Sequence, residues 1–178
     1  MLAKNFRIIA LVVGLMLIFV AFASSANAQD ANYKLHAGLL YHFTKHIEWP
    51  SNKQSGDFVI GVLGNANLTA AVEEMAKNRT VGNQKITVIQ VKNVEEANRC
   101  HIVYVQKFQN SQFNAVHPKA KASHVLLITE SEEGGKRGAG INFITIDEKL
   151  KFELNRSAIE ESGLKVSNEL VKSAIPIG

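Results

Sequence analysis

Three short apolar runs constrain the fold of this chain more than any other feature of its sequence. They are Phe58-Val59-Ile60-Gly61-Val62-Leu63, residues 101–105, and residues 124–129 with Val125-Leu126-Leu127-Ile128 at the centre. A strand covered on both faces has this continuous apolar composition, whereas a strand with one face in water alternates apolar and polar residues. The runs therefore predict strands buried inside a layered fold.

Segments with helical spacing separate these runs. An amphipathic helix is expected from Asp30 or Asn32 to about Glu48, and Pro50 ends it because the residue before a proline is disfavoured in the α conformation. Its expected apolar stripe consists of Leu35, Leu39, Leu40, Phe43 and Ile47. Further elements are a helix over 68–77, a strand over 85–91, a helical turn over 94–98, and a weaker helix over 108–116 that ends before Pro118.

The last third of the chain has a different pattern. Residues 141–146 and 150–154 are separated only by a short polar turn, which predicts an antiparallel hairpin. Asn155 and Ser167 are suitable caps for two closing helices, and Gly163 suits the end of the first. Strands that alternate with helices favour a parallel sheet. We therefore expect an α/β fold in three layers, with a mostly parallel sheet flanked by helices and a C-terminal antiparallel hairpin.

Residues 1–28 have the organisation of a secretory signal peptide. They contain no acidic residue, and Lys4 and Arg7 precede an apolar run from Ile8 to Ala23. The triplet Ala26-Asn27-Ala28 then matches the small-residue pattern of a cleavage site. The run is shorter than the roughly 20 residues that span a bilayer. We expect cleavage after Ala28, export to the periplasm, and one domain over residues 29–178.

Composition excludes several classes of protein. The chain has 20 basic and 16 acidic residues, and two of the basic ones belong to the expected signal peptide. The remaining cations are scattered, whereas a nucleic-acid-binding protein shows a basic stripe. The only cysteine, Cys100, rules out an intramolecular disulfide. The expected mature chain is long enough to bury a core that needs no such link.

His42 and His46 are weak candidates for a metal site. Their spacing of four places both rings on one side of a helix, but Phe43 stands where the H-E-x-x-H motif has its glutamate. A third ligand would have to come from elsewhere, such as His36, Glu48 or His101. Rings on the edge of an apolar stripe more often cover the core. We therefore assign no metal and no cofactor.

The sequence offers no convincing catalytic group. Cys100 and His101 are adjacent on an expected strand, so their side chains point to opposite faces, and a buried thiol is the simpler interpretation. The segment Gly134-Gly135-Lys136-Arg137-Gly138-Ala139-Gly140 lacks the order of a phosphate-binding loop and precedes a strand. It is better explained as a flexible connection, although its two cations could meet an anionic partner.

Three stretches together resemble the YfiR family. They are Tyr41-His42-Phe43-Thr44-Lys45-His46-Ile47-Glu48-Trp49-Pro50, then Cys100-His101-Ile102-Val103-Tyr104-Val105, and the C-terminal series Gly140-Ile141-Asn142-Phe143, Leu150-Lys151-Phe152-Glu153-Leu154-Asn155 and Gly163-Leu164-Lys165-Val166-Ser167-Asn168-Glu169-Leu170. The E-W-P and I-N-F…F-E-x-N elements are the most specific. Family members often carry paired cysteines, and this chain has only Cys100.

The resemblance implies a periplasmic α/β protein without known catalysis. A well-understood member represses an inner-membrane diguanylate cyclase by binding its periplasmic sensor domain, and an outer-membrane lipoprotein can sequester that repressor. The expected partners are thus a membrane diguanylate cyclase or other sensor, such a lipoprotein, and a second copy in a homodimer. The role implied is control of cyclic-di-GMP and biofilm formation.

Six residues are candidates for contact with a partner or ligand. They are Glu48, Trp49, Asn142, Lys151, Glu153 and Asn155. Core packing is the alternative for Trp49, and structural hydrogen bonds are the alternative for the two asparagines. Lys151 and Glu153 point away from Phe152 and are suited to an exposed binding edge.

Two other functions remain open. One is a small-ligand or metal-binding accessory of a transport system that uses the crevice at the strand ends. The other is a hydrolase that uses Cys100 or His101.

Overall fold

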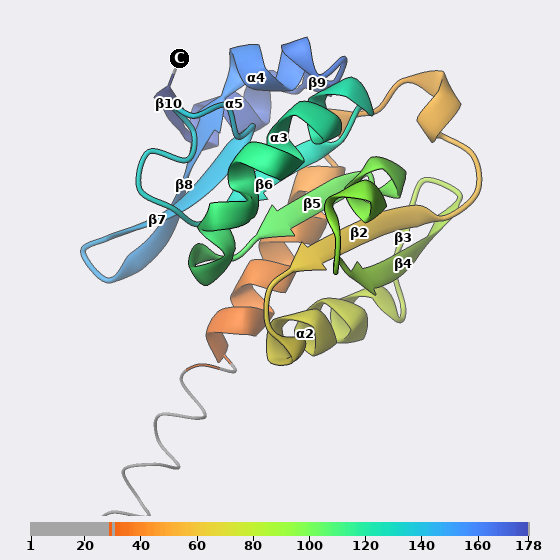
Figure 1. Cartoon of the computed structure of the whole chain (residues 1–178), viewed down its shortest axis with the longest axis horizontal. Coiled ribbons are helices and arrows are strands. Elements are labelled where there is room, and N and C mark those ends of the chain that lie inside the picture. Colours follow the sequence, from red (N-terminus) through yellow and green to blue (C-terminus); the bar gives the residue numbers. More distant parts are fainter. Residues whose placement is uncertain (1–28, 30, 178) are drawn as a thin grey trace, which may run out of the picture.

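The buried runs form the middle of a mixed α/β structure with a central, mostly parallel sheet flanked by helices (Figure 1). The computed structural model describes residues 29 and 31–177, so the expected signal peptide lies outside the described residues. Across the sheet the strands follow the order β10 (Ile175–Ile177), β8 (Lys149–Asn155), β7 (Ile141–Ile146), β6 (Leu126–Thr129), β5 (Ile102–Val105), β2 (Phe58–Leu63), β4 (Gln84–Gln90) and β3 (Thr80–Val81). Neighbours are parallel except for the pairs β7–β8 and β3–β4.

Both faces of the sheet carry an apolar layer, as the continuous runs predict. Successive side chains of a strand point to opposite faces. In β5, Ile102 and Tyr104 accordingly join one buried cluster while Val103 and Val105 join the other. The helix over residues 31–44 and α2 (Ala66–Ala76) cover the first face, and α3 (Phe113–Ala122) covers the second (Figure 1). The three-layer α/β prediction is therefore confirmed.

The N-terminal helix is shorter than its sequence suggests, and it buries a different face. It ends at Thr44, whose hydroxyl donates to the carbonyl of Tyr41, rather than at Glu48. Ile47–Glu48 form a strand, β1, that pairs antiparallel with β9 (Lys165–Val166). The expected stripe is also only partly right, because Leu35 is 51% exposed. The buried face instead uses Tyr33, His36, Ala37, Leu40 and Phe43, which also have helical spacing.

The prediction that a helix ends before Pro118 is wrong. A 3-10 helix over Lys107–Gln112 leads into α3, and Pro118 lies inside α3. A proline in this position removes one hydrogen bond of the helix. Three buried residues, Phe113, Val116 and Ala120, anchor the helix before and after the proline, so packing outweighs that loss.

The C-terminal elements follow the expected order, with two additions. The hairpin β7–β8 is antiparallel, and the side chains of Asn155 and Ser167 cap α4 (Arg156–Glu161) and α5 (Asn168–Ser173). Gly163 adopts a φ of 73° after α4, the left-handed conformation that glycine favours. The sequence did not indicate β9 or β10, which are very short strands.

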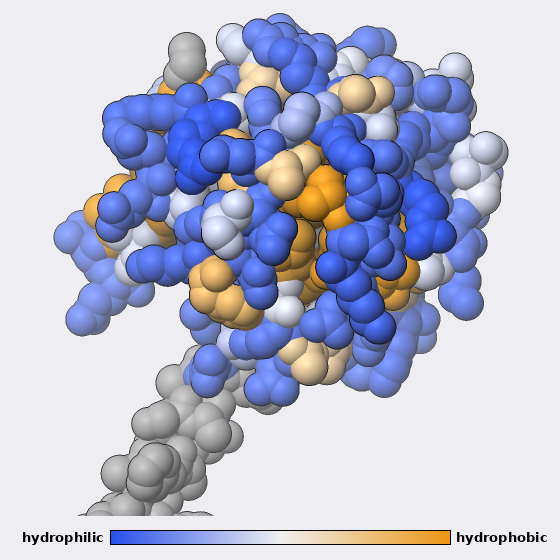
Figure 2. All heavy atoms as spheres, in the orientation of Figure 1, coloured by the Kyte–Doolittle hydropathy of each residue, from blue (hydrophilic) through white to orange (hydrophobic). Residues whose placement is uncertain are grey.

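The face shown in Figure 2 is mostly hydrophilic. None of the helices in the described ranges is long and apolar enough to cross a membrane.

Candidate functional site

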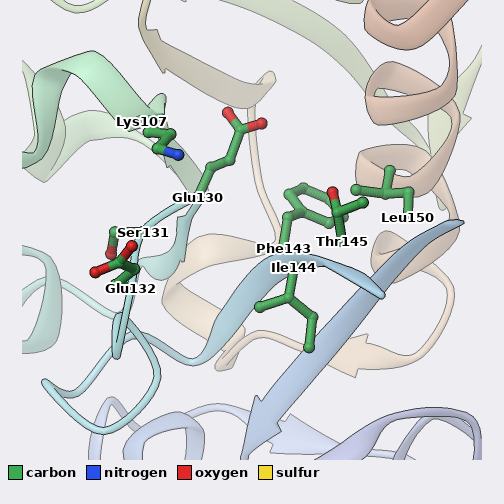
Figure 3. A pocket seen from close by; sticks show the side chains of 8 residues that line it. All are labelled: Lys107, Glu130, Ser131, Glu132, Phe143, Ile144, Thr145 and Leu150. Carbon is green, nitrogen blue, oxygen red and sulfur yellow. The ribbon is translucent and has the colours of Figure 1, made fainter. Parts of the chain in front are cut away.

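A cleft opens at the carboxyl ends of the parallel strands β5 and β6, the part of an open α/β sheet where ligands usually bind. Its main cavity has a volume of about 600 Å³, and its walls include Tyr33, His36, Tyr104, Lys107, Phe108 and Glu130. A second hollow of about 360 Å³ shares Lys107 and Glu130 with the first and extends to the β7–β8 hairpin, at Phe143, Thr145 and Leu150 (Figure 3). The N-terminal helix, two strand ends and the hairpin therefore meet at one site.

The floor of the cleft is a buried polar cluster of His36, Tyr104 and Glu130. His36 is only 2% exposed, and its Nδ1 lies 2.8 Å from the carbonyl oxygen of Asn32. Its Nε2 faces Glu130 Oε1 at 3.6 Å and has no hydrogen-bond partner among the described residues. The Tyr104 hydroxyl donates to the other carboxylate oxygen, Glu130 Oε2, at 3.0 Å.

Ring contacts fix the position of this cluster. The His36 ring stacks on Tyr104 with a centroid distance of 5.8 Å and meets Phe143 edge-on at 4.8 Å. Phe143 also packs edge-on against Tyr104 at 5.6 Å. The helix, β5 and β7 each contribute one ring, so the imidazole is held rigidly at the cleft floor.

The electrostatics keep Glu130 ionised and Tyr104 protonated. Burial alone raises the pKa of Glu130, but the neighbouring His36 and the hydrogen bond from Tyr104 outweigh it and hold that pKa below its usual value. Burial, followed by the charge of Glu130, raises the pKa of Tyr104 far above that of a free phenol. The floor therefore presents a carboxylate together with an imidazole nitrogen.

Asn142 and Glu153, two of the residues singled out in the sequence, belong to a structural network behind the cleft. Asn142 is fully buried. Its Oδ1 accepts hydrogen bonds from Thr129 Oγ1 at 2.8 Å and from the Ser131 N–H at 3.1 Å. Its amide group donates to the Ser131 carbonyl at 3.0 Å and to Glu153 Oε2 at 2.8 Å. All four hydrogen-bonding positions of this side chain are used. Asn142 therefore ties β6, β7 and β8 together.

Asn155 and the glycine-rich segment also have structural contacts. The Asn155 amide donates to the Gly135 carbonyl at 2.9 Å, while its oxygen caps α4 at the Ala158 N–H. A Cβ on Gly134 would overlap the Thr129 hydroxyl. The segment expected to be a flexible connection is thus packed closely against the sheet, and its glycines permit that close approach.

The exposed binding edge expected at Lys151 and Glu153 is only partly present. Strand β10 pairs with β8 in parallel, with Ile175 opposite Glu153, so this part of β8 is not the edge of the sheet. Lys151 lies beyond that pairing and is exposed. The sequence could not show this, because β10 becomes a strand only through pairing with β8.

Glu48 and Trp49 line a separate hollow of about 370 Å³ between β1 and the β3–β4 turn. Trp49 is 5% exposed, its Nε1 donates to the His101 carbonyl at 3.1 Å, and its ring packs edge-on against Phe58 at 4.9 Å. Glu48 is exposed and lies 3.4 Å from the ammonium of Lys165 on β9. Trp49 is therefore part of the core, with an edge that reaches the hollow.

His42 and His46 lie side by side, with ring centroids 4.6 Å apart. His46 Nδ1 is 3.0 Å from Ser167 Oγ and 3.9 Å from Glu169 Oε2. Burial, then the proximity of His46 and Lys45, lowers the pKa of His42. No group of three or more His, Cys, Asp or Glu side chains in the described ranges is placed to hold a metal ion.

Cys100 and His101 directly precede β5, whereas the cleft lies at the carboxyl end of that strand. Burial raises the pKa of the Cys100 thiol to about 11, and its Sγ donates to the Glu96 carbonyl at 3.4 Å. His101 accepts from the Val59 N–H at Nδ1 and donates to the Lys53 carbonyl from Nε2. The thiol is therefore protonated at neutral pH, and both imidazole nitrogens are occupied by the backbone.

Comparison with known protein families supports the resemblance seen in the sequence. A family described as YfiR/HmsC-like matches residues 33–175 of the 178-residue chain. The chain belongs to the YfiR/HmsC-like family. Among curated proteins, no relative matches the chain.

The family motifs and the cleft floor overlap at one residue only. Tyr104 lies in the motif strand that begins at Cys100, whereas His36 and Glu130 lie outside the motif stretches. In the sequence, His36 was named only as a possible third ligand of a metal site, and Glu130 was not named. The usable signal for Glu130 was its position, because it directly follows a buried strand and crevices form at such strand ends.

Proposed function

We propose that this protein is an exported, periplasmic regulatory binding protein that inhibits an inner-membrane diguanylate cyclase through the periplasmic sensor domain of that enzyme. The observation that carries the proposal is membership of the YfiR/HmsC-like family over residues 33–175. A basic start, an apolar run and an A-x-A site in residues 1–28 are consistent with export.

The environment of the only thiol supports a binding role over hydrolysis. A nucleophilic cysteine needs a lowered pKa and an adjacent base. Cys100 has a raised pKa, and the neighbouring His101 is committed to backbone groups of Val59 and Lys53.

We propose Glu48 and Lys151 as direct contacts with the partner, since both side chains are exposed. Trp49, Asn142, Glu153 and Asn155 would act by holding the surrounding surface in shape. An outer-membrane lipoprotein that sequesters the repressor and a homodimer are further parts of the proposal. Light scattering of the purified protein tests the homodimer.

Gene deletion and direct binding test the main proposal together. Deletion is expected to raise cellular cyclic-di-GMP, and the purified protein is expected to retain the periplasmic domain of the cyclase on a column. Lys151→Glu should weaken that retention, whereas the matched charge reversal Lys85→Glu on the exposed side of β4 should not. Unchanged cyclic-di-GMP together with no retained sensor domain would refute the proposal.

A second candidate function is a small-ligand-binding accessory of a transport system. The cleft of about 600 Å³ at the strand ends favours it, because small-molecule sites commonly have this size and position. The metal-binding form rests on His42 and His46. Equal zinc uptake by the protein and by the His42→Ala/His46→Ala variant in equilibrium dialysis would eliminate that form.

A further inference from the structure

We infer that the free side of β7 is the surface through which two copies of this chain pair, in an antiparallel β7–β7 contact around a two-fold axis. The inference deepens the proposed function, because it rests on the homodimer which that function includes and names its interface. It is carried by the pairing pattern of the sheet and by the hollow beside β7.

Strand β7 is longer than the neighbour that covers one of its sides. β8 pairs with all six residues of β7, whereas β6 reaches only Ile141 and Asn142. In the described part of the chain, no strand therefore pairs with residues 143–146 on the side away from β8. The hollow of about 360 Å³ lies along this free side, between Phe143 and Thr145 and the chain that follows β6 (Figure 3).

The Asn142 side chain keeps this space open. Ser131 would have to continue β6 along β7, but its N–H donates to Asn142 Oδ1 at 3.1 Å and its carbonyl accepts from the Asn142 amide at 3.0 Å. Both backbone groups of Ser131 are thus bonded to a side chain of β7, and β6 ends at Thr129. The gap beside β7 is therefore a fixed feature of the fold.

The other outer strand segments of the sheet carry features that discourage pairing. Exposed strand edges are commonly protected by proline, by charged side chains or by being very short. β10 contains Pro176, the part of β8 beyond β10 contains Lys149 and Lys151, and β3 has only two residues. The segment Phe143-Ile144-Thr145-Ile146 has no charge, proline or glycine, and its residue types favour strands. This edge is therefore suited to receive a strand.

The charges beside the hollow suit an uncharged strand. Lys107, Glu130 and Glu132 line it, and Glu130 is already held by His36 and Tyr104. One ammonium and one carboxylate remain, so the hollow has no net charge that would attract a strongly charged peptide.

The sequence of β7 is complementary to a second copy of itself. Alternate residues point to opposite faces, so Ile144 and Ile146 share one face while Phe143 and Thr145 share the other. Residues directly opposite each other in an antiparallel pair lie on the same face. A two-fold axis at Thr145 meets this condition within the free segment and places Ile144 of each copy opposite Ile146 of the other. Ile146 is 37% exposed in the single chain, and this contact would bury it against another isoleucine.

Disulfide trapping tests the register, using protein purified after expression from its full-length gene. Thr145 is exposed, and the axis places it opposite Thr145 of the second copy. Thr145→Cys is expected to form a covalent dimer under mild oxidation, because directly opposed residues of paired strands are close enough for a disulfide. Lys149→Cys, exposed on the same hairpin but one strand further from the axis, is the matched control and should remain a monomer. The native Cys100 is buried.

Sedimentation equilibrium tests the contact without a covalent link. We expect the parent protein to dimerise reversibly at micromolar concentration, because two paired hairpins bury less surface than a standard interface. Ile146→Lys should raise the dimer dissociation constant at least about tenfold, since symmetry introduces the lysine twice. Leu35→Lys, at an exposed position on the N-terminal helix, is the control and should change that constant by no more than about twofold. Circular dichroism checks that each variant is folded.

A double variant tests whether Ile144 and Ile146 oppose each other. Adding Ile144→Glu to Ile146→Lys places opposite charges at both cross-strand positions, so the double variant should dimerise more tightly than Ile146→Lys alone. A further loss of affinity in the double variant would contradict this register.

The inference is overturned if Thr145→Cys and Lys149→Cys cross-link equally, or if Ile146→Lys dimerises as tightly as the parent. If the parent is nevertheless a dimer, the homodimer of the proposed function stands and only its interface is wrong. A parent that stays monomeric throughout the micromolar range removes both the inference and the homodimer, but not the inhibition of a cyclase, which retention of the periplasmic domain measures separately. If the parent is monomeric and Ile146→Lys loses that retention, the edge receives a strand of the cyclase and the inference of a second copy is wrong.

Discussion

Cys100 shows how strongly burial controls the chemistry of a single side chain. Its thiol is fully buried in the apolar layer on the α3 side of the sheet, and its pKa is raised to about 11. The thiolate is the reactive form of cysteine, and at pH 8 only about one thiol in a thousand would be ionised.

We therefore predict that the native protein reacts with Ellman's reagent at pH 8 at least about 100-fold more slowly than the urea-unfolded protein. Leu35→Cys, which places a thiol at a position 51% exposed, should give one rapidly reacting group per chain and serves as the control. Rapid reaction of the native parent protein would show that Cys100 is accessible.

His101, which directly precedes β5, makes the stability of the fold depend on pH. Burial lowers its pKa below the usual value for histidine, and the neutral ring accepts the Val59 N–H at Nδ1. A histidine with a depressed folded-state pKa stabilises the fold above its unfolded pKa, and this stability is lost as the pH falls through the folded value. The pKa values of His42 and His117 are lowered in the same direction.

The free energy of unfolding from urea titrations is accordingly expected to decrease as the pH falls from 7.5 to 5.5. The contribution of His101 is at most about 1.4 kcal/mol per pH unit. His101→Gln retains one donor and one acceptor but does not titrate, so its stability should change less with pH. Parallel pH profiles of the two proteins would contradict this role for His101.

At the scale of elements, the β7–β8 hairpin has a turn in which one residue, Glu148, does not suit its backbone. Asp147 and Glu148 have φ values of 50° and 59°, the pattern of a type I′ turn. Asn-Gly is the preferred pair in such turns, and a positive φ is unfavourable for glutamate.

Replacing the pair by Asp147→Asn and Glu148→Gly is expected to stabilise the protein by about 1 kcal/mol, measured by urea denaturation. Glu73→Gly, an exposed substitution inside α2, should instead lower stability by about 1 kcal/mol and controls for the general effect of glycine. Equal destabilisation by both changes would show that the turn geometry is not the deciding factor.

The elements also show where local sequence is a good guide and where it is not. Asn65, Asn155 and Ser167 each accept a hydrogen bond from the third residue of the following helix, and the two later caps were expected from their residue type. The end of the N-terminal helix and the continuation of α3 through Pro118 were missed. In both cases packing or strand pairing with distant residues decides the outcome, and local preference is too weak to oppose it.

At the scale of the whole molecule, β10 closes one side of the sheet. It pairs with β8 from Ile175 to Ile177, and a Cβ on Gly135 would overlap the Ile177 side chain. Removing this strand would expose the backbone of β8 at its far end, and exposed strand edges promote aggregation.

A chain that stops after Ala174 is therefore expected to lose about 2–3 kcal/mol of unfolding free energy and to aggregate more readily, as measured by urea denaturation and light scattering. Ile177→Ser within the full-length chain is the companion variant, because it keeps the strand pairing and removes only the apolar contact near Gly135. The truncated chain should be the less stable of the two. If it is as stable as the parent, β10 contributes nothing to the fold.

The sequence by itself determined the α/β class, the closing hairpin, the family resemblance and the three buried strands. Those strands were expected over 58–63, 101–105 and 124–129 and lie at 58–63, 102–105 and 126–129. These features depend on residue periodicity, on turn and cap residues, and on the order of the motifs, all of which can be read from neighbouring residues. Only the tertiary structure decided that β10 pairs with β8, that Asn142 uses all its hydrogen-bonding positions, and that His36 lies beside Glu130 on the cleft floor. The physical reason is that strand pairing and side-chain contacts join residues far apart in the chain. The residues around one partner do not indicate which distant residue it will contact.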